Sequence, residues 1–456
     1  MGELIKNRFL SKKLAIDKRI QSFDEIDQGY DEETAVLEAS RCLACKNAPC
    51  KNACVVHNDI PLFINYIKNK EYKKAYEIIR QTSCLSSICG RVCPHEKFCE
   101  GHCTMGIKFE AINIGGLERF VSDYYASNIT KKINSNNHKI AIIGSGPAGL
   151  SCANKLNNMG YDVTVYEKNK LLGGTMSYAI PEYRLPYKVI ESEINKIKNS
   201  GVNFVCEKKI DNIQELFKQY EAIFIATGIN SINKMDIINE NINGVYYGNR
   251  LLEEVKLKQL ENKELSFDAK DKVVAVIGGG NVAIDTATTA IRLKAKHVYI
   301  IYRRSFEQMP ANKQELDNAI SEGVDFKLLT NPIEIIGQNK VEAIKCVNMK
   351  LGQVDSSGRQ SPVVVEGSEQ IIPVDMVIMA LGAKADFDLD EGIKTNRGHI
   401  IVDENYMTSI KGVFASGDVV TGMKTVSEAM SSGIEVAKAI DKYLKGVDDE
   451  KSIGEC

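Results

Sequence analysis

Nine of the chain's 13 cysteines lie close together, between Cys42 and Cys103. They form two groups, which are Cys42, Cys45, Cys50 and Cys54 in CLACKNAPCKNAC, and Cys84, Cys89, Cys93, Cys99 and Cys103 in CLSSICGRVCPHEKFCEGHC. Thiolates at such short spacing can reach a soft metal centre, either structural zinc or iron–sulfur. A disulfide framework is less favoured, because scaffolds of that kind are usually short secreted chains.

A first glycine motif follows in IAIIGSGPAGLSCANKLNNMGYDVTVYEK. Gly144, Gly146 and Gly149 form GxGxxG between a predicted strand and a predicted helix. Glycines there allow the backbone to approach a pyrophosphate, and the helix N-terminus offers free N–H groups to it. Glu167 ends the next predicted strand, where a carboxylate can accept a hydrogen bond from a ribose hydroxyl. Strand, glycines, helix, strand and acid in this order predict a dinucleotide site.

A second glycine motif lies in VVAVIGGGNVAIDTATTAIRL, where Gly278, Gly280 and Ala283 form GxGxxA. The strand that follows ends in Arg303 and Arg304 instead of an acid. A guanidinium at this place can pair with a 2′-phosphate, which a carboxylate would repel. The motif therefore favours NADP(H) over NAD(H), and the alternative is that one arginine is merely a solvated strand end.

Two dinucleotide sites in one chain suggest one bound flavin and one diffusing nicotinamide. Many flavoproteins of this kind pass electrons to a cysteine pair, but LLGGTMSYAIPEYRLP contains no cysteine, and the second region offers only Cys346. A disulfide reductase is therefore excluded. The clustered cysteines are the remaining route for electrons, and iron–sulfur is favoured there because zinc cannot carry electrons.

The elements that must position these residues fall into three sections. The chain has 456 residues, and domains of roughly 150 residues suggest about three of them. The cysteine section contains IPLFINYIKNKEYKKAYEIIRQT, whose apolar spacing predicts helix. NITKKINSNNH, residues 128–138, is typical of a linker, and the strands HKIAIIG and KVVAVIG open two α/β units.

The overall composition is that of an ordinary globular protein. The chain is 44% hydrophobic and 26% charged, with a net charge of −2, so no strong field favours nucleic acid or a membrane surface. We expect no transmembrane helix, because no apolar run has the necessary length of roughly 18 residues. The start lacks the apolar core of a signal peptide, so we expect a cytoplasmic protein.

The combined motifs resemble a known family. GxGxxG…ATG…GxGxxA…ALG…GD is similar to flavoproteins with two dinucleotide-binding domains. Together with EASRCLACKNAPC, CGRVCPHEKFCEGHC, AINIGGLERF, AIPEYRLP and YRRS, it resembles the small (beta) subunit of NADPH-dependent glutamate synthase. Relatives include the flavin–NADPH subunit of bifurcating ferredoxin:NADP transhydrogenase and the electron-input part of dihydropyrimidine dehydrogenase. The C-x5-C spacing from Cys93 to Cys99 is closer to these relatives.

The resemblance implies an α/β fold with an N-terminal α-helical iron–sulfur domain and two Rossmann-like dinucleotide-binding domains. The helical domain, with two [4Fe–4S] clusters, would cover residues 1–135. The FAD domain would comprise 136–247 and 386–456, with the NADPH domain, 248–385, inserted into it.

The resemblance also assigns residues to each cofactor. FAD would be bound by Gly144, Gly146, Gly149, Glu167, Gly174, Thr227, Gly228, Gly417, Asp418, Thr425 and Val426. NADPH would be bound by Gly278, Gly280, Asn281, Arg303, Arg304 and Gly382. One cluster would take Cys42, Cys45, Cys50 and Cys103, and the other Cys54, Cys93, Cys99 and Glu118. Glu118 is otherwise a solvated helix residue, and Glu182 and Arg184 either line the flavin–nicotinamide junction or form a loop salt bridge.

The implied function is that of an NADPH oxidoreductase that passes electrons through FAD and iron–sulfur clusters to a larger catalytic or electron-accepting subunit. The same module serving transhydrogenation, with ferredoxin as partner, or pyrimidine reduction is the alternative. A zinc-bearing flavoprotein that senses redox state is a third interpretation. No nucleic-acid or membrane partner is expected.

Overall fold

The computed structural model describes residues 5–125, 134–229, 231–355, 358–385, 387, 389–390 and 392–446. Residues 128–133 of the predicted linker and the C-terminal Cys456 lie outside the described residues. The α-helices are α1 (Ile16–Arg19), α2 (Glu32–Ser40), α3 (Pro49–Ala53), α4 (Ile60–Lys68), α5 (Tyr72–Arg80), α6 (Ser86–Val92), α7 (Ile114–Tyr124), α8 (Pro147–Asn158), α9 (Thr175–Tyr178), α10 (Tyr187–Asn199), α11 (Gly248–Glu261), α12 (Asn281–Arg292), α13 (Lys313–Ser321), α14 (Asp418–Thr421) and α15 (Val426–Leu444). Short 3-10 helices are η1 (His95–Lys97), η2 (Glu100–His102), η3 (Thr104–Ile107), η4 (Ile213–Lys218) and η5 (Phe306–Gln308).

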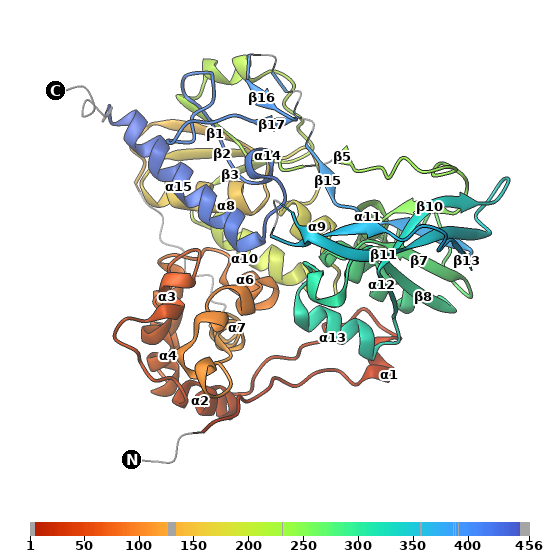
Figure 1. Cartoon of the computed structure of the whole chain (residues 1–456). Helices are drawn as coiled ribbons and strands as arrows, with labels where there is room; N and C mark the ends of the chain where they lie inside the picture. Colours follow the sequence, from red (N-terminus) through yellow and green to blue (C-terminus); the bar gives the residue numbers. More distant parts are fainter. Residues whose placement is uncertain are drawn as a thin grey trace, which may run out of the picture.

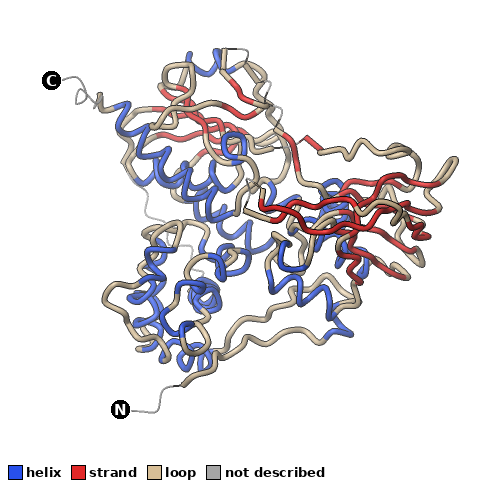
Figure 2. Tube along the Cα trace, viewed as in Figure 1, coloured by secondary structure: helices blue, strands red, loops and turns tan. Residues whose placement is uncertain are grey.

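The strands are β1 (Lys139–Ile143), β2 (Asp162–Tyr166), β3 (Asn203–Val205), β4 (Ala222–Ile225), β5 (Ser231–Ile232), β6 (Val245–Tyr247), β7 (Val273–Ile277), β8 (His297–Tyr302), β9 (Asp325–Leu328), β10 (Thr330–Ile336), β11 (Ala343–Val354), β12 (Gln360–Val364), β13 (Gln370–Pro373), β14 (Met376–Met379), β15 (Ala383–Lys384), β16 (Thr395–Asn396), β17 (His399–Ile400) and β18 (Val413–Ala415). Figure 2 shows the strands gathered in the two α/β units and the cysteine section as helix and loop. None of the helices in the described ranges has the length and apolarity needed to cross a membrane.

The cysteine section is a small helical domain at the lower left of Figure 1. The run predicted to be helical forms two helices, α4 and α5, which are separated by a turn at residues 69–71. Lys70 lies in that turn with a positive φ of 58°, which ends the first helix. Ile60, Phe63, Ile64 and Ile67 are buried along α4, at the i, i+3, i+4, i+7 spacing of an amphipathic helix.

Two parallel five-stranded sheets carry the glycine motifs. The first has the order β18-β4-β1-β2-β3, so the late strand β18 completes a sheet that starts with β1. The second has the order β6-β14-β7-β8-β9, and it is formed by chain that lies between β4 and β18. This interrupted order is the predicted α/β arrangement. The domain boundaries stay a prediction, and β6, placed before the predicted boundary at residue 247, pairs with the second sheet.

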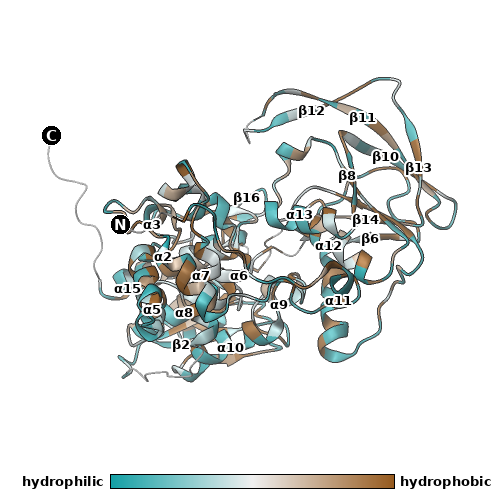
Figure 3. Cartoon of the chain, turned by 90° about the horizontal axis from the view of Figure 1, so that it is seen from below, coloured by the Kyte–Doolittle hydropathy of each residue, from teal (hydrophilic) through white to brown (hydrophobic). Residues whose placement is uncertain are grey.

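A separate antiparallel sheet, β10-β11-β12 with β13 beside β11, extends from the second α/β unit (Figure 1). In this unit α11 is amphipathic, with Leu251, Leu252 and Val255 buried. Figure 3 shows both brown and teal segments along α11. Burial of such apolar faces is the main source of stability here.

The helical domain shares a hydrophobic core with the first α/β unit. Leu85 and Ile88 of the α6 region are fully buried in the same cluster as Met176 and Met430. Glu193 of α10 reinforces the contact, because its buried carboxylate accepts hydrogen bonds from Arg80 (2.7 Å) and Ser87 (2.5 Å). The cysteines are thus fixed against the first glycine motif's unit.

An N-terminal arm, residues 5–31, ties the helical domain to the second α/β unit. Arg119 of α7 forms ion pairs with Glu25 and Asp27 of the arm, at 3.0 and 3.2 Å. Further along, the arm's Arg19 lies 3.5 Å from Asn318 Oδ1 of α13. Ile26 N also donates to Tyr183 O at 2.9 Å. The arm therefore contacts a loop of the first α/β unit that packs against the second unit.

Candidate functional site

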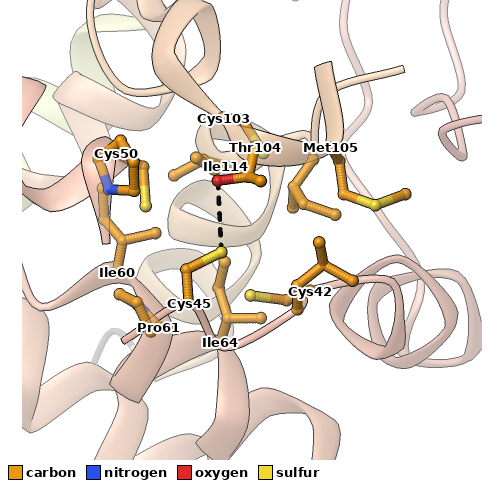
Figure 4. A pocket seen from close by; sticks show the side chains of 13 residues that line it. Cys42, Cys45, Cys50, Ile60, Pro61, Ile64, Cys103, Thr104, Met105 and Ile114 are labelled. Carbon is orange, nitrogen blue, oxygen red and sulfur yellow. Dashed lines mark hydrogen bonds between the residues drawn. The ribbon is translucent and has the colours of Figure 1, made fainter. Parts of the chain in front are cut away.

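The first cysteine pocket, called site 1 below, contains four thiols. Cys42, Cys45, Cys50 and Cys103 line it together with apolar side chains that include Ile60, Ile64, Met105 and Ile114. Figure 4 shows these four cysteines around the hollow, where Cys45 Sγ donates a hydrogen bond to Thr104 Oγ1 at 3.4 Å. Cys50 lies in the first turn of α3, and Cys103 lies between η2 and η3. Short helices thus bring together thiols that are distant in the sequence.

Site 1 is electrostatically suited to a cation. Burial, together with the neighbouring Cys103 and Cys42, raises the pKa of Cys50 to about 12. Several thiolates in such apolar surroundings are costly unless a positive centre compensates them. The donor set therefore fits a thiolate-bound metal centre.

The second cysteine pocket, called site 2, lies beside the first α/β unit. Cys54, Cys93, Cys99 and Glu118 line it, together with Cys89, His95 and Ser427. Glu118 is not a solvated helix residue, since it is 7% exposed, and burial raises its pKa to about 8. Its carboxylate has one hydrogen-bond donor nearby, Asn58 Nδ2 at 3.5 Å. Within the described part of the chain this buried carboxylate has no ion-pair partner, which fits a site that receives positive charge.

Each of the two sites gathers its four predicted ligand side chains around one hollow. Among the described residues, no three His, Cys, Asp or Glu side chains converge closely enough to hold one metal ion. The thiols instead line two separate hollows, and thiolates are ligands of both zinc and iron–sulfur clusters. All cysteines of the described residues are free, which does not support a disulfide framework.

Cys89, His95 and Ser427 also line site 2, although the sequence motifs assigned none of them as a ligand. Cys89 lies in the lining of site 2, whereas Cys84 is buried outside both linings. The Nε2 atom of His95 is buried and has no hydrogen-bond partner among the described residues. The first glycine of GG in AINIGGLERF leaves room for the His95 ring, because a Cβ on Gly115 would lie 2.3 Å from that ring. This glycine was the sequence signal for close packing at His95. Ser427 lies more than 300 positions away along the chain, and no motif pointed to it.

The first glycine loop has the shape that a pyrophosphate needs. A Cβ at Gly144 would lie 2.4 Å from Ala226 O, and a Cβ at Gly149 would lie 2.0 Å from Gly144 O. A Cβ at Gly146, in contrast, would meet nothing within 4 Å. Gly146 is also the N-cap of α8, so the free space lies at a helix N-terminus. Glu167 is buried at the end of β2 and accepts a 2.6 Å hydrogen bond from Ser145 Oγ. These features fit the adenosine half of a dinucleotide.

The other predicted FAD residues surround the same loop. Gly174 approaches Gly146, because a Cβ on it would lie 2.9 Å from Gly146 Cα. Thr227 and Gly228 follow β4, which is the direct neighbour of β1. From the C-terminal part, a Cβ on Gly417 would lie 3.2 Å from Ala148 Cβ of α8. The structure thus brings the early and late predicted FAD residues together at the carboxyl ends of the parallel strands β1, β4 and β18.

Two late residues of this set have clear electrostatic features. Burial raises the pKa of Asp418 to about 6, while a hydrogen bond from Lys424 N opposes the rise. Thr425 is the N-cap of α15 and forms a capping box with Glu428, and Val426 is the first helical residue. The N-terminus of this 19-residue helix carries a partial positive charge that suits an anionic reduced flavin.

The second glycine loop begins at Gly278, beside the end of β8, because Gly278 N donates to Ile301 O at 3.1 Å. A Cβ at Gly280 would meet nothing within 4 Å, so this loop also leaves room for a phosphate. Asn281 starts α12, and its side-chain Oδ1 accepts from Asn312 N at 2.9 Å. Gly382 follows β14, which is the neighbour of β7, and it has a positive φ of 85°. A Cβ on Gly382 would lie 3.0 Å from the Met423 side chain of the first unit.

The two predicted phosphate-binding arginines differ sharply. Arg303 is exposed just beyond β8. Arg304 is 5% exposed, and it donates to Asp355 Oδ2 at 2.7 Å and to Gln360 O at 2.8 Å. Arg304 is therefore committed to the antiparallel sheet, and Arg303 is the guanidinium that faces solvent at the strand end.

Glu182 and Arg184 both form salt bridges between the two α/β units. Glu182 lies 2.6 Å from Lys256 Nζ of α11. Arg184 donates two hydrogen bonds to Asp285 of α12, at 2.9 and 2.6 Å, and also pairs with Glu315. The loop salt bridge foreseen as one of two interpretations is present, and it fixes one unit against the other.

Comparison with known proteins places the chain in a family. The model described as pyridine nucleotide-disulphide oxidoreductase matches residues 138–433. The glutamate synthase [NADPH] small chain of Escherichia coli K12 is 34% identical over 450 residues, covering 93% of this chain and 94% of that protein. The chain belongs to the glutamate synthase small-chain family. The resemblance predicted from the motifs is thereby confirmed, as is the α/β fold class.

Other members of the family have different named roles. The NADP(+)-dependent formate dehydrogenase subunit beta of Moorella thermoacetica is 38% identical over 432 residues, and the match covers 87% of this chain but only 60% of that longer protein. The NAD-dependent dihydropyrimidine dehydrogenase subunit PreT of E. coli K12 is 33% identical over 429 residues, covering 93% and 97%. The family is therefore shared by subunits with different named dehydrogenase and synthase roles.

A second model and a solved structure complete the comparison. The model described as dihydropyrimidine dehydrogenase domain II, 4Fe-4S cluster, matches residues 19–130. Mycobacterium tuberculosis FprA in complex with NADPH superposes with a TM-score of 0.58 at 19% identity, over 68% of this chain and 85% of that one, which shows a shared fold. The family member described here is an NADPH-dependent flavoprotein oxidoreductase with an iron–sulfur domain.

Proposed function

We propose that this chain is the electron-input subunit of a glutamate synthase-type complex, and that a larger partner subunit accepts the electrons. The observation that carries the proposal is the lining of site 2, which joins cysteines of the helical domain to Ser427 at the N-terminus of α15. FAD would supply the ability to take a hydride from NADPH and release electrons singly, which iron–sulfur clusters carry. The protein's own part is to orient, to insulate and to hold these groups.

The residues divide this work between them. Gly144, Gly146 and Gly149 would cradle the FAD pyrophosphate, and the α15 N-terminus would favour the anionic flavin. Gly280 and Arg303 would hold NADPH on the opposite unit. The Glu182 and Arg184 ion pairs fix the angle between the two units, so these residues would act as positioning groups for the flavin–nicotinamide junction.

Two cluster sites are part of the proposal. Site 1 would use Cys42, Cys45, Cys50 and Cys103, and site 2 would use Cys54, Cys93, Cys99 and Glu118. The apolar lining of site 1 would keep water from its thiolates, whereas the polar residues of site 2 would interact with its cluster, and both effects tune cluster potentials.

Anaerobic purification with iron, sulfide and flavin analysis tests the proposal. We expect about eight irons per chain and, on addition of NADPH, bleaching of the flavin followed by EPR signals of reduced clusters. Cys45→Ser should remove the signal of one cluster and Cys93→Ala that of the other. Cys84→Ser, whose thiol is buried outside both linings, is the matched control. Zinc without iron or sulfide would instead support the redox-sensing flavoprotein.

A second candidate function has specific support. The C-x5-C spacing between Cys93 and Cys99, and the match of residues 19–130 to the dihydropyrimidine dehydrogenase model, favour a dehydrogenase or transhydrogenase partner instead. Co-purification from the native host distinguishes the two. A glutamate synthase large subunit would establish the first, whereas ferredoxin or a dehydrogenase subunit would establish the second.

A further inference from the structure

One residue connects site 2 to the first α/β unit. Of the described residues that line site 2, Ser427 alone comes from outside residues 54–118. Its Oγ lies 3.4 Å from Cys93 Sγ, and the residue is 3% exposed. A thiolate bound to iron has no proton, so Cys93 could only accept in this pair and the Ser427 hydroxyl would donate.

The position of the hydroxyl is fixed by the start of α15. Thr425 Oγ1 donates to the carboxylate of Glu428 at 2.7 Å. It lies 3.1 Å from Ser427 Oγ, and because its proton goes to Glu428 it is the competing acceptor for the Ser427 proton. Thr425 N donates to the same carboxylate at 2.9 Å, and Glu428 N donates back to Thr425 Oγ1 at 3.2 Å. The Thr425–Glu428 capping box therefore fixes the backbone of the first turn, which carries Ser427.

The same helix offers a matched comparison one turn later. Ser431 Oγ donates to Val55 O at 2.7 Å, so it also ties α15 to the loop that follows Cys54. This contact docks the helix but involves no sulfur atom. Ser427 and Ser431 thus separate an effect on the cluster ligand from an effect on docking.

A hydrogen bond to a ligand sulfur changes the reduction potential of a cluster. Reduction adds negative charge, which spreads onto the sulfurs, so a donor stabilises the reduced state more than the oxidised state. The partial positive charge of the helix N-terminus acts in the same direction. We propose that Ser427 is a positioning residue that raises the reduction potential of the cluster at site 2 through its hydrogen bond to Cys93. This inference rests on the proposed function, because it requires a cluster in site 2.

The test is a redox titration of the anaerobic, iron-loaded, full-length protein, followed by EPR. Ser427→Ala should lower the equilibrium constant for one-electron reduction of one cluster about tenfold, which corresponds to about 59 mV. Ser427→Thr keeps the hydroxyl and should leave the potential at the wild-type value. Ser431→Ala should also leave it there, and all variants should keep the wild-type content of iron and FAD.

The outcomes separate this inference from the proposed function. An unchanged potential in an iron-loaded Ser427→Ala protein overturns the inference, and so does an equal shift in Ser431→Ala, which would reveal a docking effect. A wild-type protein without iron at site 2 overturns the proposed function and the inference together. If Ser427→Ala loses its cluster, electron–nuclear double resonance on the wild-type protein in H₂O and D₂O tests directly whether a hydroxyl proton contacts the cluster. The inference requires an exchangeable proton coupled to the reduced cluster, and its absence refutes it.

Discussion

The contrast between Arg303 and Arg304 gives the sharpest prediction about coenzyme choice. Arg303 is exposed two residues beyond Ile301, the residue whose carbonyl bonds to the first glycine of the second loop. A guanidinium there can pair with a 2′-phosphate, and a hydrogen bond to a charged group contributes about 1.5–3 kcal/mol. Because Arg303 is exposed, solvent screens the pair, and the lower end of that range applies. About 1.4 kcal/mol corresponds to a factor of about ten.

Arg303→Ala should therefore lower kcat/KM for NADPH about tenfold and leave kcat/KM for NADH unchanged. The assay is anaerobic flavin reduction in a stopped-flow instrument with each coenzyme. Arg304→Ala is the control, because its guanidinium already pairs with Asp355 and Gln360, and it should affect both coenzymes alike. The opposite pattern, in which Arg304→Ala changes the preference and Arg303→Ala does not, would refute this reasoning. It would mean that the Asp355 pair opens when the coenzyme binds.

Three further predictions concern the FAD loop and the contact between units. Gly146→Ala should leave the stability of the apoprotein unchanged but weaken FAD retention in equilibrium dialysis, whereas Gly144→Ala should lower the unfolding midpoint, since its Cβ would strike a carbonyl oxygen. The folded-state pKa of Asp418, about 6, lies above its usual 3.8, so its contribution to the free energy of unfolding should be full below pH 3.8 and fall as the pH rises to about 6. Asp418→Asn should remove that dependence in urea titrations, and an unaltered pH profile would contradict the assignment. Arg184→Met should cost about 3–5 kcal/mol, measured by the same titrations, because it leaves the buried carboxylate of Asp285 without its partner; a loss below about 1 kcal/mol would contradict it.

The sequence predicted the local elements because their signals are local. Strand, glycine turn and helix follow one another within about 30 residues at both loops, so periodicity and glycine placement were sufficient for β1–α8 and β7–α12. The helical run at residues 60–82 was also recognised, but the break at Lys70 was not, since no glycine or proline marks it. Propensity alone does not reveal a turn that packing imposes.

The long-range contacts could not be read from the sequence. Arg304 fits the phosphate-binding pattern as well as Arg303 does, and only the folded antiparallel sheet shows that Asp355 occupies it. Glu118 likewise has the pattern of an ordinary helix glutamate until packing buries it. In each case the decisive partner lies many residues away, so its effect depends on the tertiary structure.

The lining of the two cysteine pockets has a consequence for the order in which the protein matures during synthesis. Site 1 is lined by residues 42–114, so its walls can form once the first quarter of the chain has left the ribosome. Site 2 includes Ser427, and it acquires its last wall only when nearly the whole chain has been made. The proposed ligands of site 2 are therefore all made early, whereas the wall that faces α15 closes only after the flavin-binding unit is complete.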